Sequence, residues 1–141
     1  MNEALPEIDL VRRFVVEDQA VRGQFVRLDA AWSMLLEHAD YPEPVRVLLG
    51  EAMTAAVLLA STLKFEGSLT LQIKSEGAVR LLVAQCTHDF RIRGVARFDA
   101  PRVTPDFAAL AGGGHMTVTV DSNGDASRYQ GIVAIDGDSL S

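Results

Sequence analysis

One segment constrains the fold of this chain more than any other: the run from Val45 to Leu63, which is almost entirely apolar. Pro42 and Pro44 stand where it begins, and proline is tolerated in a first helical turn because its missing N–H has no intrahelical role there. The apolar residues cover more than one stripe, and the interruptions by Arg46, Gly50 and Glu51 all come early. We therefore expect a helix that is buried on nearly all sides, most fully in its second half.

Alternating segments on both sides of this helix predict strands. The clearest one follows Gly67, where Leu69, Leu71 and Ile73 alternate with polar residues. Short turn signals separate it from the next two apolar segments, so these three strands are expected to form an antiparallel meander. The expected strands are Leu10 to Val16, Gly23 to Leu28, Ser68 to Ser75, Val79 to Thr87, Phe90 to Phe98, His115 to Val120 and Tyr129 to Ile135.

Two shorter helical segments are also expected. Asp29 is a candidate N-cap for a helix from Ala30 to about His38. A short helical turn is predicted from Asp106 to Ala111, and a strong turn from Asp121 to Asp125. With 141 residues the chain fits a single α+β domain that spans residues 1–141 and can bury a real core.

The balance of charge excludes some partners. The formal net charge is −6, with 13 Lys and Arg against 19 Asp and Glu. Nucleic acids and anionic membranes both attract basic surfaces, so we expect neither as a partner. The uncharged run Ala52 to Leu63 is shorter than the roughly 20 apolar residues that a membrane span needs. Met1 to Leu10 is acidic and lacks the apolar core of a signal peptide, so no export is implied.

Cys86 is the only cysteine, which excludes an internal disulfide and favours a reduced, cytosolic setting. Cys86 and His88 would share a strand face about 7 Å apart, and a thiol beside an imidazole can act as a nucleophile. The plainer interpretation is a buried cysteine next to an exposed turn. We favour it, because nothing marks the oxyanion pocket that a catalytic pair needs.

Two further patterns have a functional and a structural interpretation. Gly112 to Gly114 is glycine-rich like a phosphate-binding loop, but a strand rather than a helix follows and no Lys stands after it, so a flexible loop is favoured. The histidines His38, His88 and His115 are scattered and lack the spacing of a metal site. We therefore assign no catalytic, cofactor-binding or metal-binding residue.

Arginines form the only basic cluster of the chain. Arg91, Arg93 and Arg97 would share one face of a strand, with Arg80 and Arg102 nearby. The cluster suits an anionic partner, or else a solvated sheet face paired with acidic residues. The negative net charge favours the second interpretation.

Several short blocks are informative together, through their order and spacing. They are Ala20 to Gly23, Asp40 to Pro42 with Pro44-Val45, Leu58-Leu59 with Thr62 to Gly67, Leu69 to Gln72, Arg93 to Arg97, Arg128 to Gly131, and Gly137-Asp138 with Leu140. In these blocks the chain resembles the 33-kilodalton redox-regulated heat-shock chaperones, the 33 kDa chaperonin family. The resemblance spans about the whole chain.

The resemblance implies an ATP-independent holdase of the cytoplasm that binds unfolding proteins under heat and oxidative stress, without catalysis. It also implies a core of two packed antiparallel β-layers that enclose a central buried helix, and a homodimer. In the family, a linker and a C-terminal zinc domain follow this core. Four cysteines there bind zinc when reduced and form disulfides when oxidised, which uncovers apolar surface.

This chain departs from the family pattern in two ways. It has none of the four switch cysteines, and it stops before the last strands of the family's core. We therefore expect an incomplete N-terminal core without cofactor, without the zinc redox switch, and with no redox role for Cys86. Missing strands leave an open sheet edge, which favours pairing with a second copy, including by domain swapping.

Three functional hypotheses remain at this stage. The first is the holdase core, which would bind clients through apolar sheet or edge surface while the helix Val45 to Leu63 serves as core. The second is a small thiol enzyme that uses Cys86 and His88. The third is a purely structural dimerisation module.

Overall fold

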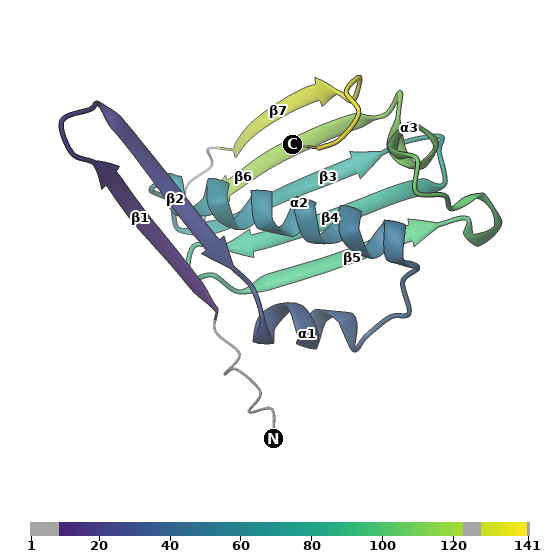
Figure 1. Ribbon diagram of the computed structural model, residues 1–141, viewed down its shortest axis with the longest axis horizontal. Helices are drawn as coiled ribbons and strands as arrows, with labels where there is room; N and C mark the ends of the chain where they lie inside the picture. The colour runs from purple at the N-terminus through teal and green to yellow at the C-terminus, as the bar shows by residue number, and fades with distance from the viewer. Residues whose placement is uncertain (1–8, 123–127, 141) are drawn as a thin grey trace.

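A computed structural model describes residues 9–122 and 128–140 of the chain (Figure 1). The turn predicted from Asp121 to Asp125 lies partly outside the described residues. The elements, in chain order, are β1 (Leu10–Val16), β2 (Val21–Arg27), α1 (Ala30–Leu36), α2 (Glu43–Thr62), β3 (Gly67–Lys74), β4 (Val79–Thr87), β5 (Ile92–Phe98), a 3-10 turn (Ala100–Arg102), α3 (Phe107–Ala111), β6 (His115–Ser122) and β7 (Arg128–Ala134).

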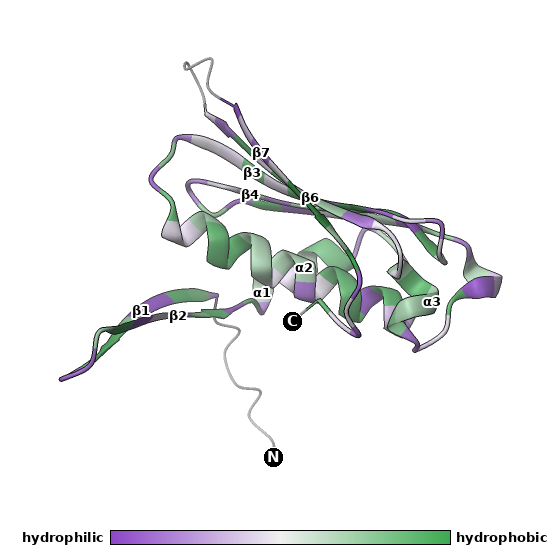
Figure 2. Cartoon of the chain, turned by 90° about the horizontal axis from the view of Figure 1, so that it is seen from above, coloured by the Kyte–Doolittle hydropathy of each residue, from purple (hydrophilic) through white to green (hydrophobic). Residues whose placement is uncertain are grey.

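Two antiparallel sheets form the layers of the molecule. The larger one has five strands in the order β5-β4-β3-β6-β7, and the smaller one is the hairpin β1-β2. The long helix α2 lies between them, with the five-stranded sheet on one side and the hairpin on the other (Figure 2). This confirms the predicted α+β class, with two antiparallel β-layers and a helix packed between them.

The core lies between α2 and the larger sheet. Leu69, Leu71 and Ile73 of β3 are fully or almost fully buried, as their alternation predicts. The register pairs Leu69 with Cys86 and Leu71 with Ala84, so the buried residues of β3 and β4 share one face. Antiparallel partners point to the same side of a sheet, and this side meets the helix. The predicted meander of β3, β4 and β5 is confirmed.

The helix α2 is less enclosed than its composition predicts. Nine of its residues are buried, but Val47 remains 51% exposed and Leu59 39% exposed. Val47 is exposed because the small sheet reaches only the C-terminal end of the helix (Figure 1), whereas Leu59 lines an open groove between that end and the hairpin β1-β2. Among the described residues, α2 is the one helix long and apolar enough to cross a bilayer, and buried core helices have the same properties.

The short helix α1 is capped differently from the prediction. Asp29 stands at the N-cap position, but its side chain makes no capping hydrogen bond and instead pairs with Arg27 at 2.8 Å. The carboxylate of Asp9, 20 residues earlier, accepts the backbone N–H groups of Asp29 at 2.7 Å and of Ala31 at 3.0 Å. The helix then ends at Leu36, before the predicted His38. The capping function therefore belongs to a distant residue rather than to the local one.

Candidate functional site

The hairpin β1-β2 has two faces with different surroundings. On the inner face, Val11 and its partner Val26 pack against the core. The Arg13 guanidinium donates a hydrogen bond of 3.0 Å to the carbonyl of Ser61 at the end of α2. The Ser61 hydroxyl also donates to the side-chain oxygen of Gln24, the register partner of Arg13. These contacts attach the hairpin to the C-terminal end of α2.

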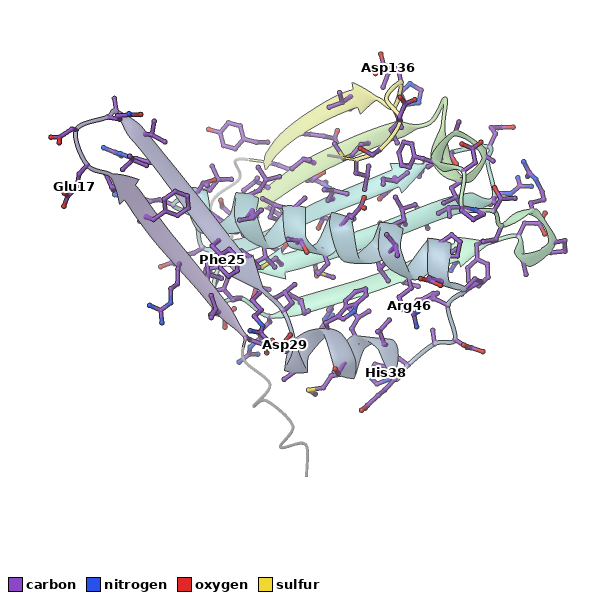
Figure 3. All side chains as sticks on the ribbon, viewed as in Figure 1. Glu17, Phe25, Asp29, His38, Arg46 and Asp136 are labelled. Atoms are coloured by element: carbon purple, nitrogen blue, oxygen red, sulfur yellow. The ribbon has the colours of Figure 1, made fainter. Side chains whose placement is uncertain are left out.

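The opposite face of the hairpin is open to solvent and carries large apolar side chains beside Arg12, the register partner of Phe25. By the alternation of an antiparallel pair it presents Phe14, Val16, Val21 and Phe25, which we call the outer hairpin face. Phe14 is 50% and Phe25 56% exposed, and both valines are exposed as well. Figure 3 shows Phe25 on β2 and Glu17 in the turn at the tip of the hairpin.

Gly23 explains how the Phe14 ring is placed on this face. Gly23 lies opposite Phe14 in the register. A β-carbon at Gly23 would overlap the ring of Phe14, so the ring lies directly across the glycine. Because Gly23 has no side chain, the Phe14 ring can pack over the backbone of β2, and the other side of the ring remains exposed.

A groove runs between the inner face of the hairpin and the end of α2. Its volume is about 710 Å³. Apolar walls come from Val15, Leu58 and Leu59, and basic side chains line it as well. We call it the basic groove; its cationic residues are Arg13, Arg22 and Lys64.

The two edges of the larger sheet differ in character. The edge strand β5 carries the exposed charges of Arg93 and Arg97, which discourage pairing with another strand. At the other edge, β7 pairs with β6 alone among the described strands. Its exposed large residues are Tyr129, Ile132 and Val133, and no charge follows Arg128 within the strand. The β7 edge therefore lacks the protection that charge gives to β5.

Cys86 does not have the environment of a nucleophile. Its side chain lies in the core, and this burial, with a smaller contribution from the negative charge of Asp89, raises its pKa to about 11. A catalytic thiol needs the opposite shift. His88 is exposed, and its Nδ1 accepts the backbone N–H of Gly67 at 3.0 Å. The geometry therefore gives the catalytic alternative no support.

The remaining candidate residues are dispersed. His38 follows α1 and His115 begins β6, so the histidines stand on separate elements. In the described ranges, no group of three His, Cys, Asp or Glu residues is placed to hold a metal ion. The expectation that this chain has no cofactor stays a prediction. The glycine segment 112–114 leads from α3 directly into β6, in agreement with the loop interpretation.

The predicted basic face is only partly formed. Arg93 and Arg97 lie in β5 and are exposed, but Arg91 precedes the strand and pairs with Asp89 at 3.3 Å. Arg102 donates instead to the backbone carbonyl of Glu76 at 3.0 Å. The cluster is therefore divided between a turn, a strand and a loop.

The outer hairpin face was not identified from the sequence. Phe14 and Val16 are two residues apart, and Val21 and Phe25 are four apart, so each pair was predictable as one strand face. The neighbouring Val11, Val15 and Val26 are apolar too and belong to the inner face. Because both faces carry large apolar residues, the alternation did not indicate which one is open.

Comparison with known proteins places this chain in a family. The family model described as Hsp33 protein matches residues 9–141. A 33 kDa chaperonin of Pseudomonas savastanoi pv. phaseolicola is 46% identical over 139 residues, covering 97% of this chain and 46% of that protein. The 33 kDa chaperonin of Pseudomonas fluorescens SBW25 is 43% identical with the same coverage. The chain thus spans about half the length of these curated relatives.

A solved structure gives the same result for the fold. The crystal structure of the 33 kDa chaperonin (heat shock protein 33 homologue) of Thermotoga maritima superposes with a TM-score of 0.73 at 25% identity. The match covers 88% of this chain and 44% of that one. With a family model that matches nearly its whole length, this chain belongs to the Hsp33 family.

Proposed function

We propose that this chain is the client-binding core of an ATP-independent holdase chaperone, which captures proteins unfolding under heat or oxidative stress and prevents their aggregation. Membership of the Hsp33 family and the chaperonin names of its relatives support the chaperone role. The holdase mechanism is inferred from exposed apolar surface, because such patches mark protein-binding sites.

One observation carries the proposal: the outer hairpin face exposes two phenylalanines side by side with two valines. Full burial of a Phe or Val side chain contributes roughly 1.5–3 kcal/mol. Since these side chains are about half exposed, each retains about 1 kcal/mol to gain on contact with a client. Unfolding proteins offer apolar segments without a fixed shape, and an open strand face accepts them without shape-specific contacts.

The proposal includes no catalysis and no cofactor in this half of the protein, and a cytoplasmic location. The zinc-dependent disulfide switch that the family resemblance implies would belong to the other half of the relatives' length, because Cys86 is the only cysteine here. In that arrangement the switch controls access to the apolar surface of the core. Cys86 itself would take no part, since its thiol is buried.

We also propose that two copies associate through the β7 edge, with or without exchange of strands. The position of β7 at the edge of the sheet and the absence of charge after Arg128 within the strand support this. A charged substitution in the strand, Ile132→Lys, is expected to shift the dimer toward monomer in sedimentation velocity. A wild-type protein that stays monomeric at micromolar concentration would contradict this part of the proposal.

The main experiment measures light scattering from a heat-unfolding client, without ATP and under reducing conditions. The chain is expected to suppress scattering near stoichiometric amounts, and the double variant Phe14→Ser/Phe25→Ser is expected to lose most of this suppression. Val95→Ser is the matched control, because Val95 is 44% exposed on the other face of the larger sheet. If the folded double variant suppresses aggregation as well as Val95→Ser does, the outer hairpin face is not the client site.

A further inference from the structure

A groove runs along the β5 edge of the larger sheet, between that strand and α1. Figure 1 shows α1 beside β5, and the two elements are in contact. The groove has a volume of about 620 Å³, and the described residues that line it all lie between Ala31 and Val95. Its walls come from α1, the segment after α1 and β5, and neither the hairpin nor the segment after β7 takes part. We call it the β5 groove.

The backbone of β5 presents hydrogen-bonding groups to this groove. At the turn between β4 and β5, the N–H of Thr87 donates to the carbonyl of Arg91 at 3.0 Å, so the backbone of Arg91 points to β4. The direction of the backbone groups alternates along an antiparallel strand. The backbone groups of Ile92, Gly94 and Ala96 therefore point away from β4, to the edge of the sheet.

Tyr41 supports this assignment and limits the open part of the edge. Its hydroxyl accepts the N–H of Ala96 at 3.3 Å, from the segment between α1 and α2. The Tyr41 ring packs against Phe98 with 6.1 Å between the ring centroids, which holds the hydroxyl in place. The edge is thus closed at Ala96, and the stretch 92–94 before it faces the groove.

A strand added beside this stretch would have different surroundings on its two faces. On the side of the sheet that faces the core, a β-carbon at Gly94 would lie 3.1 Å from Leu35 Cδ1, and Met34 and Ile92 add apolar lining. Arg93 is exposed on the other side of the sheet. Because side chains alternate between the two faces of a strand, the groove fits a segment that alternates apolar and acidic residues.

The charge of the β5 groove is positive. None of the described residues that line it is Asp or Glu, and Arg93 has no acidic partner within the described part of the chain. Arg91 also lines the groove, and its ion pair with Asp89 is exposed and therefore weak. Charge on β5 discourages pairing with another basic strand, but it favours a strand that places a carboxylate beside Arg93.

We propose that the β5 groove binds extended segments of unfolding clients in which apolar residues alternate with Asp or Glu, and that it adds them to β5 as a further strand of the larger sheet. This deepens the proposed holdase function and rests on it. Hydrogen bonds to the backbone at 92–94 are available to any extended segment, which suits clients of many sequences. The apolar wall and Arg93 select among these segments.

The first test reads hydrogen exchange of single amides by NMR, with and without a peptide that alternates Leu and Glu. The amides of Ile92 and Gly94 are expected to become protected when the peptide binds. The amides of Arg93 and Val95 are the internal control, because they already point to β4 and should change little. Peptide binding without protection of Ile92 and Gly94 would overturn the inference.

The second test compares peptides of equal length by fluorescence anisotropy. The Leu-Glu peptide is expected to bind more tightly than a Leu-Lys peptide, with a difference that added salt reduces. A Leu-Glu peptide with N-methylated backbone amides is expected to lose binding, because it cannot donate hydrogen bonds to β5. Equal binding of the Leu-Glu peptide and either of the other two would contradict strand addition with acidic selectivity.

A pair of variants tests the role of Arg93. Arg93→Gln is expected to weaken binding of the Leu-Glu peptide roughly two- to fivefold, as loss of an exposed ion pair does. Arg80→Gln is the matched control, because Arg80 is exposed near the start of β4 and does not line the groove. It changes the net charge equally and is expected to leave binding unchanged. An equal loss in both variants would attribute the effect to net charge and overturn the inference.

Two further outcomes separate this inference from the proposed function and from self-association. If the chain suppresses aggregation but the peptide does not protect Ile92 and Gly94, the groove assignment fails while the holdase function stands. If the peptide binds as expected but the chain does not suppress aggregation, the holdase function fails and the binding site stands. If Ile92 and Gly94 become protected on concentrating the chain alone, the edge holds a second copy and the inference is wrong.

Discussion

Gly67 connects α2 to the larger sheet in a backbone geometry that other residues rarely adopt. Its φ is +152°, and a β-carbon there would overlap the backbone carbonyl oxygen of Asp121 on β6. Its N–H donates to His88 Nδ1, and its carbonyl accepts the His88 N–H at 3.0 Å. The substitution Gly67→Ala therefore combines two costs, an unfavourable conformation and a collision with backbone that cannot rotate away.

The magnitude follows from these two contributions. Holding a non-glycine residue in such a conformation costs about 1–3 kcal/mol. Forcing extra volume into a packed site costs about 1–3 kcal/mol more. We therefore expect Gly67→Ala to lower the free energy of unfolding by about 2–6 kcal/mol, which is a large part of the roughly 5–15 kcal/mol of a typical domain.

Two other glycines separate the contributions. Gly113 has a φ of +75° but open space around it, so Gly113→Ala should show only the conformational cost. Gly131 has open space and no positive φ, so Gly131→Ala should be neutral or stabilising by up to about 1 kcal/mol. Urea unfolding followed by far-UV circular dichroism gives all three values by linear extrapolation. A Gly67→Ala variant no less stable than Gly113→Ala would refute the steric argument.

Two more predictions concern stability. Asp9→Ala removes the acceptor of two N–H groups at the start of α1, so it should lower the free energy of unfolding in urea by about 0.5–2 kcal/mol, and a change within error would contradict the capping role. Burial raises the pKa of the Cys86 thiol from 9.0 to about 11. Between pH 9 and pH 11 the thiol is therefore ionised in the unfolded state but still protonated in the folded state. The stability that is present below pH 9 falls as the pH rises through this range. The free energy of unfolding should decrease by about 2–3 kcal/mol over this range relative to Cys86→Ala, whose profile lacks this contribution.

Local periodicity explains what the sequence predicted correctly. In β3 every second residue is apolar, and Leu69, Leu71 and Ile73 are all buried. The α2 segment was recognisable because a run of this length and composition, opened by proline, suits a core helix. In both cases the information lies within a few consecutive residues.

Contacts between distant segments explain what it did not predict. Asp29 has the residue type of an N-cap, but the cap comes from Asp9, which only the folded chain brings close. The pairing of β6 with β3 rather than with β5 is likewise a long-range choice. A groove beside the first half of α2 is lined by both Glu51 and Asp138, which are far apart in the sequence, so no local pattern indicates it.

The position of α2 relates the stability of this fold to its proposed function. Its fully buried side chains, such as Met53, belong to the hydrophobic core and α2 contacts the larger sheet, so stability depends on that side. The other side meets the hairpin β1-β2 at the C-terminal end of the helix, where the basic groove lies between them. A client bound in this groove would contact Leu59, which is 39% exposed and so contributes little to the buried core. Leu59→Ser should therefore change client binding with little change in stability, whereas Met53→Ala should cost about 2–5 kcal/mol of stability through the cavity it creates.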